Sequence, residues 1–395
     1  MVVAGHICLD LIPTFEKHCF EGGEAGLAEI LVPGKLVNVG AAVTATGGAV
    51  SNTGLALHRL GFPARLVGKV GDDLLGHAIL EILRGHGPGL VEGMVVTKEA
   101  PSSYTVVINP PGVDRMFLHC PGANDTFGAE DVPYEELRGA RLFHFGYPPI
   151  MRRMYADGGA ELERMLRRVK ELGVTTSLDM ARPDPASEAG RAPWREVLAR
   201  ALPYVDVFLP SLDETLFMLD RERFERMGAE VNAQADGEML HELSGRLLGM
   251  GAAVVGLKLG EEGLYLRTTG EAERLGRMGS CAVGEVGEWV GRELLAPCFE
   301  VTVAGTTGSG DCAIAGFLAA LAEGRGPEEA VTSAVAVGAC NVEKADATSG
   351  IPSWAAVQER IGGKWGRRPT AVRLEGWAWE EGRGVWRGPG DRGKE

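Results

Sequence analysis

The stretch AGTTGSGDCAIAGFLAAL at residues 304–321 holds the residue types best suited to chemistry. The apolar run at 299–303 predicts a strand before it, and the apolar spacing after Asp311 predicts a helix. A helix N-terminus carries unpaired N–H groups and partial positive charge, and glycines let a backbone approach a ligand closely. This turn therefore suits a phosphate, and the Asp311 carboxylate could take a proton from a hydroxyl. The alternative is that Asp311 only caps its helix.

Two common anion-binding motifs fit this turn poorly. A P-loop needs Lys and Ser/Thr after its last glycine, whereas Asp-Cys follows Gly310. Gly308, Gly310 and Ala313 match the spacing of the dinucleotide fingerprint, but they lie late in the chain rather than near the start of a domain. A dinucleotide-dependent oxidoreductase is therefore a weak alternative.

The turn resembles the C-terminal signature D-T-x-G-A-G-D of the PfkB/ribokinase family of carbohydrate kinases. The resemblance implies that Asp311 is the catalytic base and that the amides of Gly308, Ser309 and Gly310 form an anion hole. In several members the first Asp of the signature helps to hold a monovalent cation. Gly305 stands at that position here, so potassium dependence stays open.

A second match lies in the first quarter of the chain. The stretch at 47–76 resembles the N-terminal family signature G-G-x-x-x-N, L-G and G-x-V-G-x-D-x-x-G. The pattern predicts one helix starting at Ser51 or Asn52 and another at Asp72 or Asp73. The resemblance implies that the acceptor is bound by four residues, Asp10, Gly47, Gly48 and Asn52. Asp10 ends the expected first strand, Met1–Leu11, and could instead be a solvated turn residue.

The resemblance also predicts a nucleotide side. In PSLDE the family pattern P-N-x-x-E keeps its Glu, so Glu214 is expected to act through magnesium-bound waters, with Ser211 in place of Asn. Magnesium favours oxygen ligands and keeps several waters, although Glu214 could simply complement its helix dipole. The residues expected to border ATP are Thr306, Lys258, Gly260, Ser211 and Gly350. Lys258 could equally be a surface side chain.

Strands and helices alternate after residue 140, which predicts a mostly parallel sheet with helices on both faces. The resemblance implies an α/β fold, a ribokinase-like three-layer α/β/α sandwich with a small β-sheet lid. The expected kinase domain covers 1–361, with the lid from about 14–46 and 92–124. Residues 270–296 are expected to be a loop insertion. A Gly/Arg/Trp-rich extension follows at 362–395. Three alternatives stay open for it: packing on the body, packing on a partner subunit, or a mostly disordered end.

Composition narrows the class of protein further. The 395 residues carry a net charge of −14, which argues against nucleic acid or a membrane surface as a partner. The seven Cys lack C-x-x-C spacing and follow no signal peptide, so we expect reduced thiols and a cytoplasmic protein. His6 and His144 lie in apolar runs and are expected to be core or pocket-wall residues.

We therefore predict a small-molecule kinase that transfers the γ-phosphoryl group of MgATP to a hydroxyl of a sugar or sugar derivative. The resemblance allows a homodimer through the lid. A nucleoside kinase is the alternative within the family, although the lid is poor in aromatic residues: Phe15, Phe20, Tyr104 and Phe117. A non-catalytic sugar- or nucleotide-binding protein is the alternative from another class, because Gly305 and Ser211 depart from the usual site.

Overall fold

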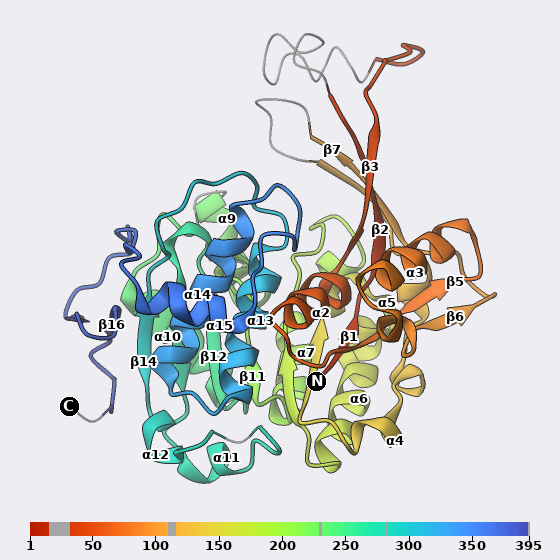
Figure 1. Cartoon of the computed structure of the whole chain (residues 1–395). Helices are drawn as coiled ribbons and strands as arrows, with labels where there is room; N and C mark the ends of the chain where they lie inside the picture. Colours follow the sequence, from red (N-terminus) through yellow and green to blue (C-terminus); the bar gives the residue numbers. More distant parts are fainter. Residues whose placement is uncertain (16–31, 110–115, 229–230, 282, 394–395) are drawn as a thin grey trace.

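The computed structural model describes residues 1–15, 32–109, 116–228, 231–281 and 283–393. Its main sheet has ten strands in the order β15-β16-β14-β13-β12-β11-β10-β9-β1-β4 (Figure 1). The strands from β4 to β12 run parallel, and β13, β14, β16 and β15 are antiparallel to their neighbours. Their bounds are β1 (Val2–Gly5), β4 (Arg65–Val67), β9 (Leu142–Gly146), β10 (Thr175–Leu178), β11 (Val207–Phe208), β12 (Val254–Lys258), β13 (Leu264–Thr268), β14 (Glu293–Ala296), β15 (Ala378–Glu380) and β16 (Val385–Arg387).

Helices cover both faces of this sheet, because its central strands are buried and apolar on both sides. One core layer contains residues of α2 (Ala49–Arg59), α3 (Leu74–His86), α13 (Ser309–Ala322), α14 (Pro327–Val342) and α15 (Trp354–Gly362). The other contains residues of α6 (Ala160–Glu171), α7 (Trp194–Ala201), α8 (Leu212–Leu219) and α10 (Gly237–Gly249). The expected three-layer α/β/α sandwich is confirmed. The shorter helices are α4 (Tyr134–Leu137), α5 (Arg152–Tyr155), α9 (Arg221–Met227), α11 (Ala272–Gly276) and α12 (Val286–Trp289).

A second sheet of four strands, in the order β3-β2-β7-β8, projects from the body as the lid (Figure 1). Its strands are β2 (Cys8–Pro13), β3 (Ala42–Gly47), β7 (Tyr104–Ile108) and β8 (Met116–Cys120). The expected single strand Met1–Leu11 is wrong, because the chain leaves the main sheet after Gly5 and enters the lid at Cys8. The lid expected at about 14–46 lies partly outside the described residues. A separate pair joins β5 (Lys69–Gly71) to β6 (Val95–Thr97).

Two further expectations about the C-terminal half are wrong. Residues 270–296 are more than a loop, since β14 within them pairs with β13 through buried Leu294 and Leu295. The apolar run at 299–303 forms no strand, and Val303 is 55% exposed. The reason is that β14 already occupies the edge of β13, so the chain that follows leaves the sheet and crosses to α13.

The C-terminal extension packs on the body. Strand β16 pairs with β14, so the extension supplies two strands of the main sheet (Figure 1). The Trp365 ring stacks on Phe299 with the ring centroids 4.0 Å apart. The Asp391 carboxylate accepts hydrogen bonds from Arg292 Nε at 2.6 Å and from Arg387 Nε at 2.8 Å. Since the side chains of Arg292 and Asp391 are 4% and 2% exposed, this ion pair is buried.

We predict that Asp391→Ala lowers the free energy of unfolding by about 3 kcal/mol, because it leaves the buried Arg292 guanidinium without one of its carboxylates. The control is Glu135→Ala, which breaks an ion pair with Arg138 whose side chains are 86% and 64% exposed. That change is expected to cost less than about 0.5 kcal/mol. Chemical denaturation measures both values, and equal effects would contradict the buried pair.

Candidate active site

The N-terminus of α13 is built to present backbone amides. Gly308 is its N-cap with a φ of 71°, and no side-chain hydrogen bond caps the helix. Helix geometry leaves the first N–H groups of such a turn without intrahelical acceptors. A Cβ on Gly308 would lie 3.0 Å from the Ala347 Cβ, so the left-handed turn and the close loop both favour glycine. The turn can therefore receive an anion at Gly308 and Gly310, whereas the Ser309 amide donates to the Thr306 carbonyl oxygen at 3.3 Å.

Asp311 does not cap its helix, so the alternative that this residue is only an N-cap is wrong. Its Oδ2 atom accepts hydrogen bonds from Asn52 Nδ2 at 3.0 Å and from Tyr147 OH at 2.8 Å. Its Oδ1 atom lies 3.4 Å from the hydroxyl of Thr53. The residue is 3% exposed, and burial raises its pKa, although Lys258 and these hydrogen bonds oppose the rise. Asp311 is thus a buried carboxylate whose oxygens hold positioned donors, as a general base requires.

Helix α2 brings Asn52 to this carboxylate. The helix begins at Ala49, two residues before the predicted start, and Gly48 is its N-cap with a φ of 89°. A Cβ on Gly48 would lie 2.5 Å from His6 Nδ1, so only glycine fits between the helix and His6. The early start places Asn52 and Thr53 on the turn that faces α13. Asp73 rather than Asp72 caps the next helix, accepting from Gly76 N at 2.8 Å.

Lys258 is the cationic centre of the site and is not a surface side chain. Its Nζ atom lies 2.6 Å from Asp179 Oδ1, and its side chain is 14% exposed. Burial alone would lower the pKa of Lys258, but Asp179 and Glu214 outweigh burial and raise it. Burial raises the pKa of Asp179 to about 8, and Lys258 opposes that rise. The lysine therefore stays charged among carboxylates at the carboxyl ends of β10 and β12.

Ser211 and Glu214 form a capping box at the start of α8. The Ser211 hydroxyl accepts from Glu214 N at 3.3 Å, and Glu214 Oε2 accepts from Ser211 N at 2.7 Å. Burial raises the pKa of Glu214, and Lys258 opposes the rise. Glu214 also lines the main cavity, so capping the helix and facing a ligand are compatible roles.

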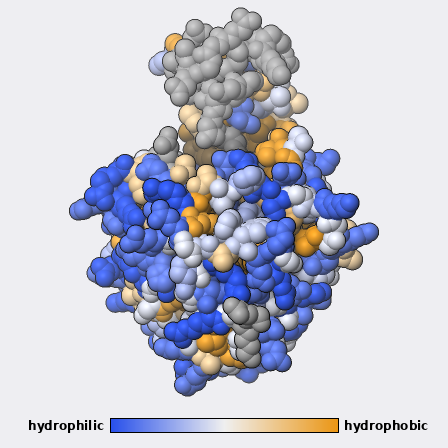
Figure 2. Space-filling view, turned by 90° about the vertical axis from the view of Figure 1, so that its left-hand side faces the viewer, coloured by the Kyte–Doolittle hydropathy of each residue, from blue (hydrophilic) through white to orange (hydrophobic). Residues whose placement is uncertain are grey.

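A cavity of about 920 Å³ joins these elements, and it lies between the body and the lid. Its lining includes Asp10, Gly48, Asn52, Asp311 and Glu214. Apolar side chains gather where the lid meets the body on the face shown in Figure 2. The structure thus brings Asp10, Gly48 and Asn52, three of the four predicted acceptor residues, and the predicted base to one space, whereas Gly47 is not part of the described lining.

The Asp10 carboxylate lies directly against Gly47, the last residue of β3. A Cβ on Gly47 would lie 2.3 Å from Asp10 Oδ2, so a side chain there would displace the carboxylate. The Cys8 thiol donates to Asp10 Oδ1 at 3.3 Å, and burial raises the pKa of Asp10. Asp10 is therefore held at the cavity rather than in a solvated turn.

The residues expected around ATP separate into two groups. Thr306 lines the cavity, and Ser211 pairs with Lys258 through a parallel backbone bridge. Lys258, Ser211, Gly260 and Gly350 are not part of the described cavity lining, and Gly260 has a φ of 60°. A Cβ on Gly350 would lie 2.4 Å from the carbonyl oxygen of Cys340, so this glycine packs against the end of α14.

Sequence reasoning missed Tyr147, Asp179 and Thr53 as site residues. Tyr147 follows the buried strand β9, adopts a φ of 67° and precedes two prolines. Its position directly after a strand-ending glycine was the available signal. Asp179 ends an expected strand in the same way, and nothing in the pattern around Thr53 distinguishes it from a core threonine.

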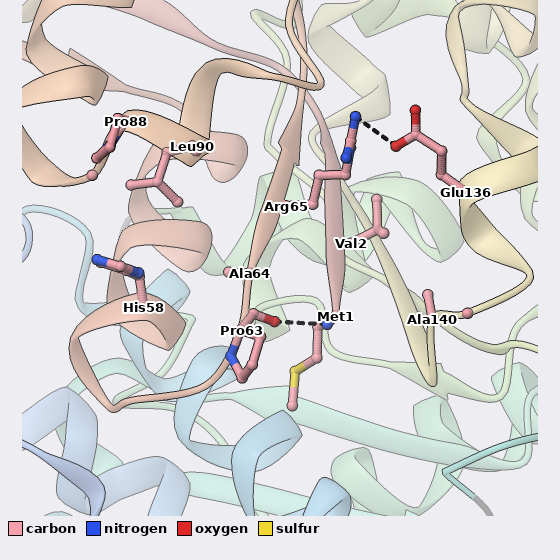
Figure 3. A pocket seen from close by; sticks show the side chains of 13 residues that line it. Met1, Val2, His58, Pro63, Ala64, Arg65, Pro88, Leu90, Glu136 and Ala140 are labelled. Atoms are coloured by element: carbon pink, nitrogen blue, oxygen red, sulfur yellow. Dashed lines mark hydrogen bonds and ion pairs between the residues drawn. The ribbon is translucent and has the colours of Figure 1, made fainter.

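A second cavity of about 550 Å³ lies at the other end of β1 (Figure 3). The Met1 ammonium donates to the carbonyl oxygen of Pro63 at 2.7 Å, and Arg65 pairs with Glu136 at 2.5 Å. In parallel sheets ligands bind at the carboxyl ends of the strands, whereas this hollow adjoins the amino ends of β1 and β4. We therefore place the active site in the larger cavity.

Comparison with known proteins identifies the family. The model of the pfkB family of carbohydrate kinases matches residues 1–354. An "Uncharacterized sugar kinase" of Archaeoglobus fulgidus is 24% identical over 298 residues, which are 75% of this chain and 98% of that protein. Fructokinase-2 of Oryza sativa is 32% identical over 113 residues, or 28% of this chain and 33% of that protein.

Solved structures share the fold. The Arabidopsis thaliana ribokinase complexed with ribose and ATP aligns with a TM-score of 0.68 at 20% identity, covering 92% of this chain and 98% of that one. The Xylella fastidiosa fructokinase with bound ATP gives 0.66 at 20% identity, with the same two coverages. The chain therefore belongs to the pfkB family of carbohydrate kinases. None of the helices in the described residues has the length and apolar character needed to span a membrane.

We predict that Tyr147→Phe moves the acid limb of the pH–activity profile to higher pH. The Tyr147 hydroxyl stabilises ionised Asp311, so its removal raises the pKa of a base that must be deprotonated to act. Activity is then lost at a higher pH as the solution is acidified. Steady-state rates between pH 5 and pH 9 measure the shift, and an unchanged limb would show that the contact does not tune the base.

We predict that Gly47→Ala raises the KM for the acceptor at least tenfold, because the new methyl group displaces the Asp10 carboxylate. The KM for ATP is expected to stay within about twofold. Gly85→Ala in α3 is the control, since nothing lies within 4 Å of its added Cβ. Equal acceptor KM values in both variants would contradict a substrate role for the Asp10–Gly47 contact.

Proposed function

We propose that the protein transfers the γ-phosphoryl group of MgATP to a hydroxyl of a sugar or sugar derivative. The observation that carries this proposal is the buried Asp311 carboxylate, which sits in the first turn of α13 and faces the cavity. Base and anion-binding amides are thereby adjacent on one short segment, as transfer of a phosphoryl group to a hydroxyl requires.

Asp311 acts as the general base in this proposal. Its Oδ2 atom already accepts from two donors, whereas Oδ1 has only the 3.4 Å contact with Thr53, so an acceptor hydroxyl can donate to Oδ1. Asp10, Gly47, Gly48 and Asn52 orient the acceptor. Removal of the hydroxyl proton by a positioned carboxylate contributes typically 10²–10⁴-fold to such rates. The lid closes over the acceptor and excludes water.

The start of α13 acts on the transferred group. The amides of Gly308 and Gly310, together with the helix dipole, stabilise negative charge there. The Lys258 ammonium lies close to this turn, since a Cβ on Gly310 would be 3.7 Å from its Nζ atom. Thr306, Ser211, Gly260 and Gly350 border the nucleotide in the proposal.

Magnesium fits the carboxylates of this site. Glu214 would hold it, and when bound it supplies neutralisation of phosphate charge. Among the described residues no group of three or more His, Cys, Asp or Glu side chains forms a metal cage. A single carboxylate suits this ion, which keeps most of its waters and takes phosphate oxygens as ligands.

A nucleoside is the second candidate acceptor. The aromatic rings of Phe117 and His119 from β8, and of Tyr155 from α5, line the cavity and offer faces to a base. Because Tyr155 belongs to the body, counting only the aromatic residues of the lid underestimates the rings available to a base.

A cytoplasmic location is also part of the proposal.

A homodimer through the lid is the proposed assembly. Phe117 and Leu118 of β8 are 58% and 59% exposed, and Val43 of β3 is 56% exposed. Apolar groups on a small projecting sheet favour association with a second copy. Light scattering of the full chain tests this assembly, and a monomeric mass at micromolar concentration would contradict it.

Measuring ADP formation from MgATP across a panel of sugars and nucleosides tests the proposed reaction. We predict that one acceptor class stimulates turnover and that Asp311→Asn lowers kcat by about 10²–10⁴-fold. Asp72→Asn, which changes a carboxylate outside the cavity, serves as the matched control. Acceptor binding without turnover in the wild type would instead favour a non-catalytic binding protein.

A further inference from the structure

His6 is a buried polar side chain that borders the main cavity. It lies between β1 and β2, is 2% exposed and belongs to the cavity lining. Neither of its ring nitrogens has a hydrogen-bond partner among the described residues. Its ring faces two others, with centroids 5.1 Å from His119 and 6.2 Å from Tyr147.

An unsatisfied buried polar group destabilises the fold, so such groups at a cavity require an explanation. Asn52 Oδ1, another lining atom, also lacks a partner in the described part of the chain. Asn52 already donates to Asp311. His6 and Asn52 both line the cavity that also contains Asp311, where an acceptor's polar groups would satisfy both residues.

The charge of this space limits what can bind. Burial lowers the pKa of His6 well below its ordinary value, and burial also lowers the pKa of His119, so both rings are neutral near pH 7. The carboxylates along the lining are Asp10, Asp125, Asp184, Glu188, Glu214 and Asp311. Arg182 is the one Lys or Arg among the described lining residues, and it pairs with Asp213 at 3.3 Å. A phosphate dianion would meet mostly like charge here.

Building on the kinase function proposed above, we propose that His6 is a specificity-determining residue whose imidazole hydrogen-bonds a hydroxyl of an unphosphorylated acceptor. A neutral imidazole offers one donor and one acceptor, which matches a sugar hydroxyl. The Asp10 carboxylate accepts from further hydroxyls. The acceptor pocket thus discriminates by hydrogen bonds, and its one described Lys or Arg, Arg182, already pairs with Asp213.

Kinetics of His6→Leu and His6→Gln test this role. His6→Leu removes both ring nitrogens and is expected to raise the acceptor KM at least tenfold, with the KM for ATP unchanged. His6→Gln keeps a donor and an acceptor and is expected to restore the acceptor KM to within about threefold. His77→Leu, at an exposed histidine of α3, is the control. Full acceptor affinity in His6→Leu would overturn the proposal.

A comparison of neutral and phosphorylated acceptors is the second test of the proposal. The wild type is expected to use a neutral sugar with a kcat/KM at least tenfold above that of its phosphate ester, and the reverse preference would overturn the proposal. If His6→Leu does not fold, ¹⁵N-histidine NMR of the wild type replaces it, with His6→Gln used for assignment. The ring nitrogens of His6 are expected to shift when a neutral sugar is added, and unchanged signals would count against the contact.

Calorimetry separates this inference from the kinase proposal. If ATP is never turned over with any acceptor, the proposed reaction fails, but titration with neutral sugars still tests His6. Binding by the wild type that weakens at least tenfold in His6→Leu supports the contact. Absence of binding for every neutral sugar, or equal binding by both proteins, overturns it.

Discussion

The proposed active site depends on one buried ammonium held among carboxylates. Lys258 Nζ contacts Asp179 at 2.6 Å, and its charge also acts on Glu214 and Asp311. Each of these acids would be driven toward its neutral form by burial alone. A neutral Asp311 cannot take a proton, and a neutral Glu214 would be a poor magnesium ligand. The charge of Lys258 opposes the rise that burial causes in the pKa of all three acids and so favours their ionised forms.

Burying these charges destabilises the folded state, because the desolvation penalty of several charges is usually larger than the free energy gained from their attraction. Parallel strands of the main sheet bring these charged groups together. Asp179 follows β10 and Lys258 ends β12, and their strand ends lie at one edge of the sheet. Tyr147 comes after β9 at that edge, and α13 points its amides toward it. The lid, built from strands on both sides of the first helix, closes the acceptor side.

The sequence predicts much of this architecture, because its strongest signals are local. The glycine turn before α13 and the alternation of strands and helices depend on neighbouring residues, and both are found in the structure. The split of the first strand at His6 and the true edge strand at Glu293–Ala296 depend on pairings between distant segments. A short apolar run such as 299–303 carries the same local signal as a strand, yet it has no open edge to join.

The site was less predictable than the fold. Motif resemblance places Asp311, Asn52 and Asp10 in one cavity, as the structure does. It says nothing of Tyr147, whose role comes from a left-handed backbone that turns its hydroxyl toward Asp311. The partner of Lys258 was equally hidden, because Asp179 lies 79 residues away in sequence. Such contacts arise from topology, which no local pattern encodes.

The most direct test of this account is a titration of the Asp311 carboxyl group by ¹³C NMR in the wild type and in Lys258→Met. The Asp311 signal is assigned by its loss in Asp311→Asn, and thermal melting checks that Lys258→Met is folded. We predict that the pKa of Asp311 rises when the ammonium is removed, since its charge favours the ionised carboxylate. An identical pKa in both proteins would contradict the claim that Lys258 favours the ionised form of the proposed base.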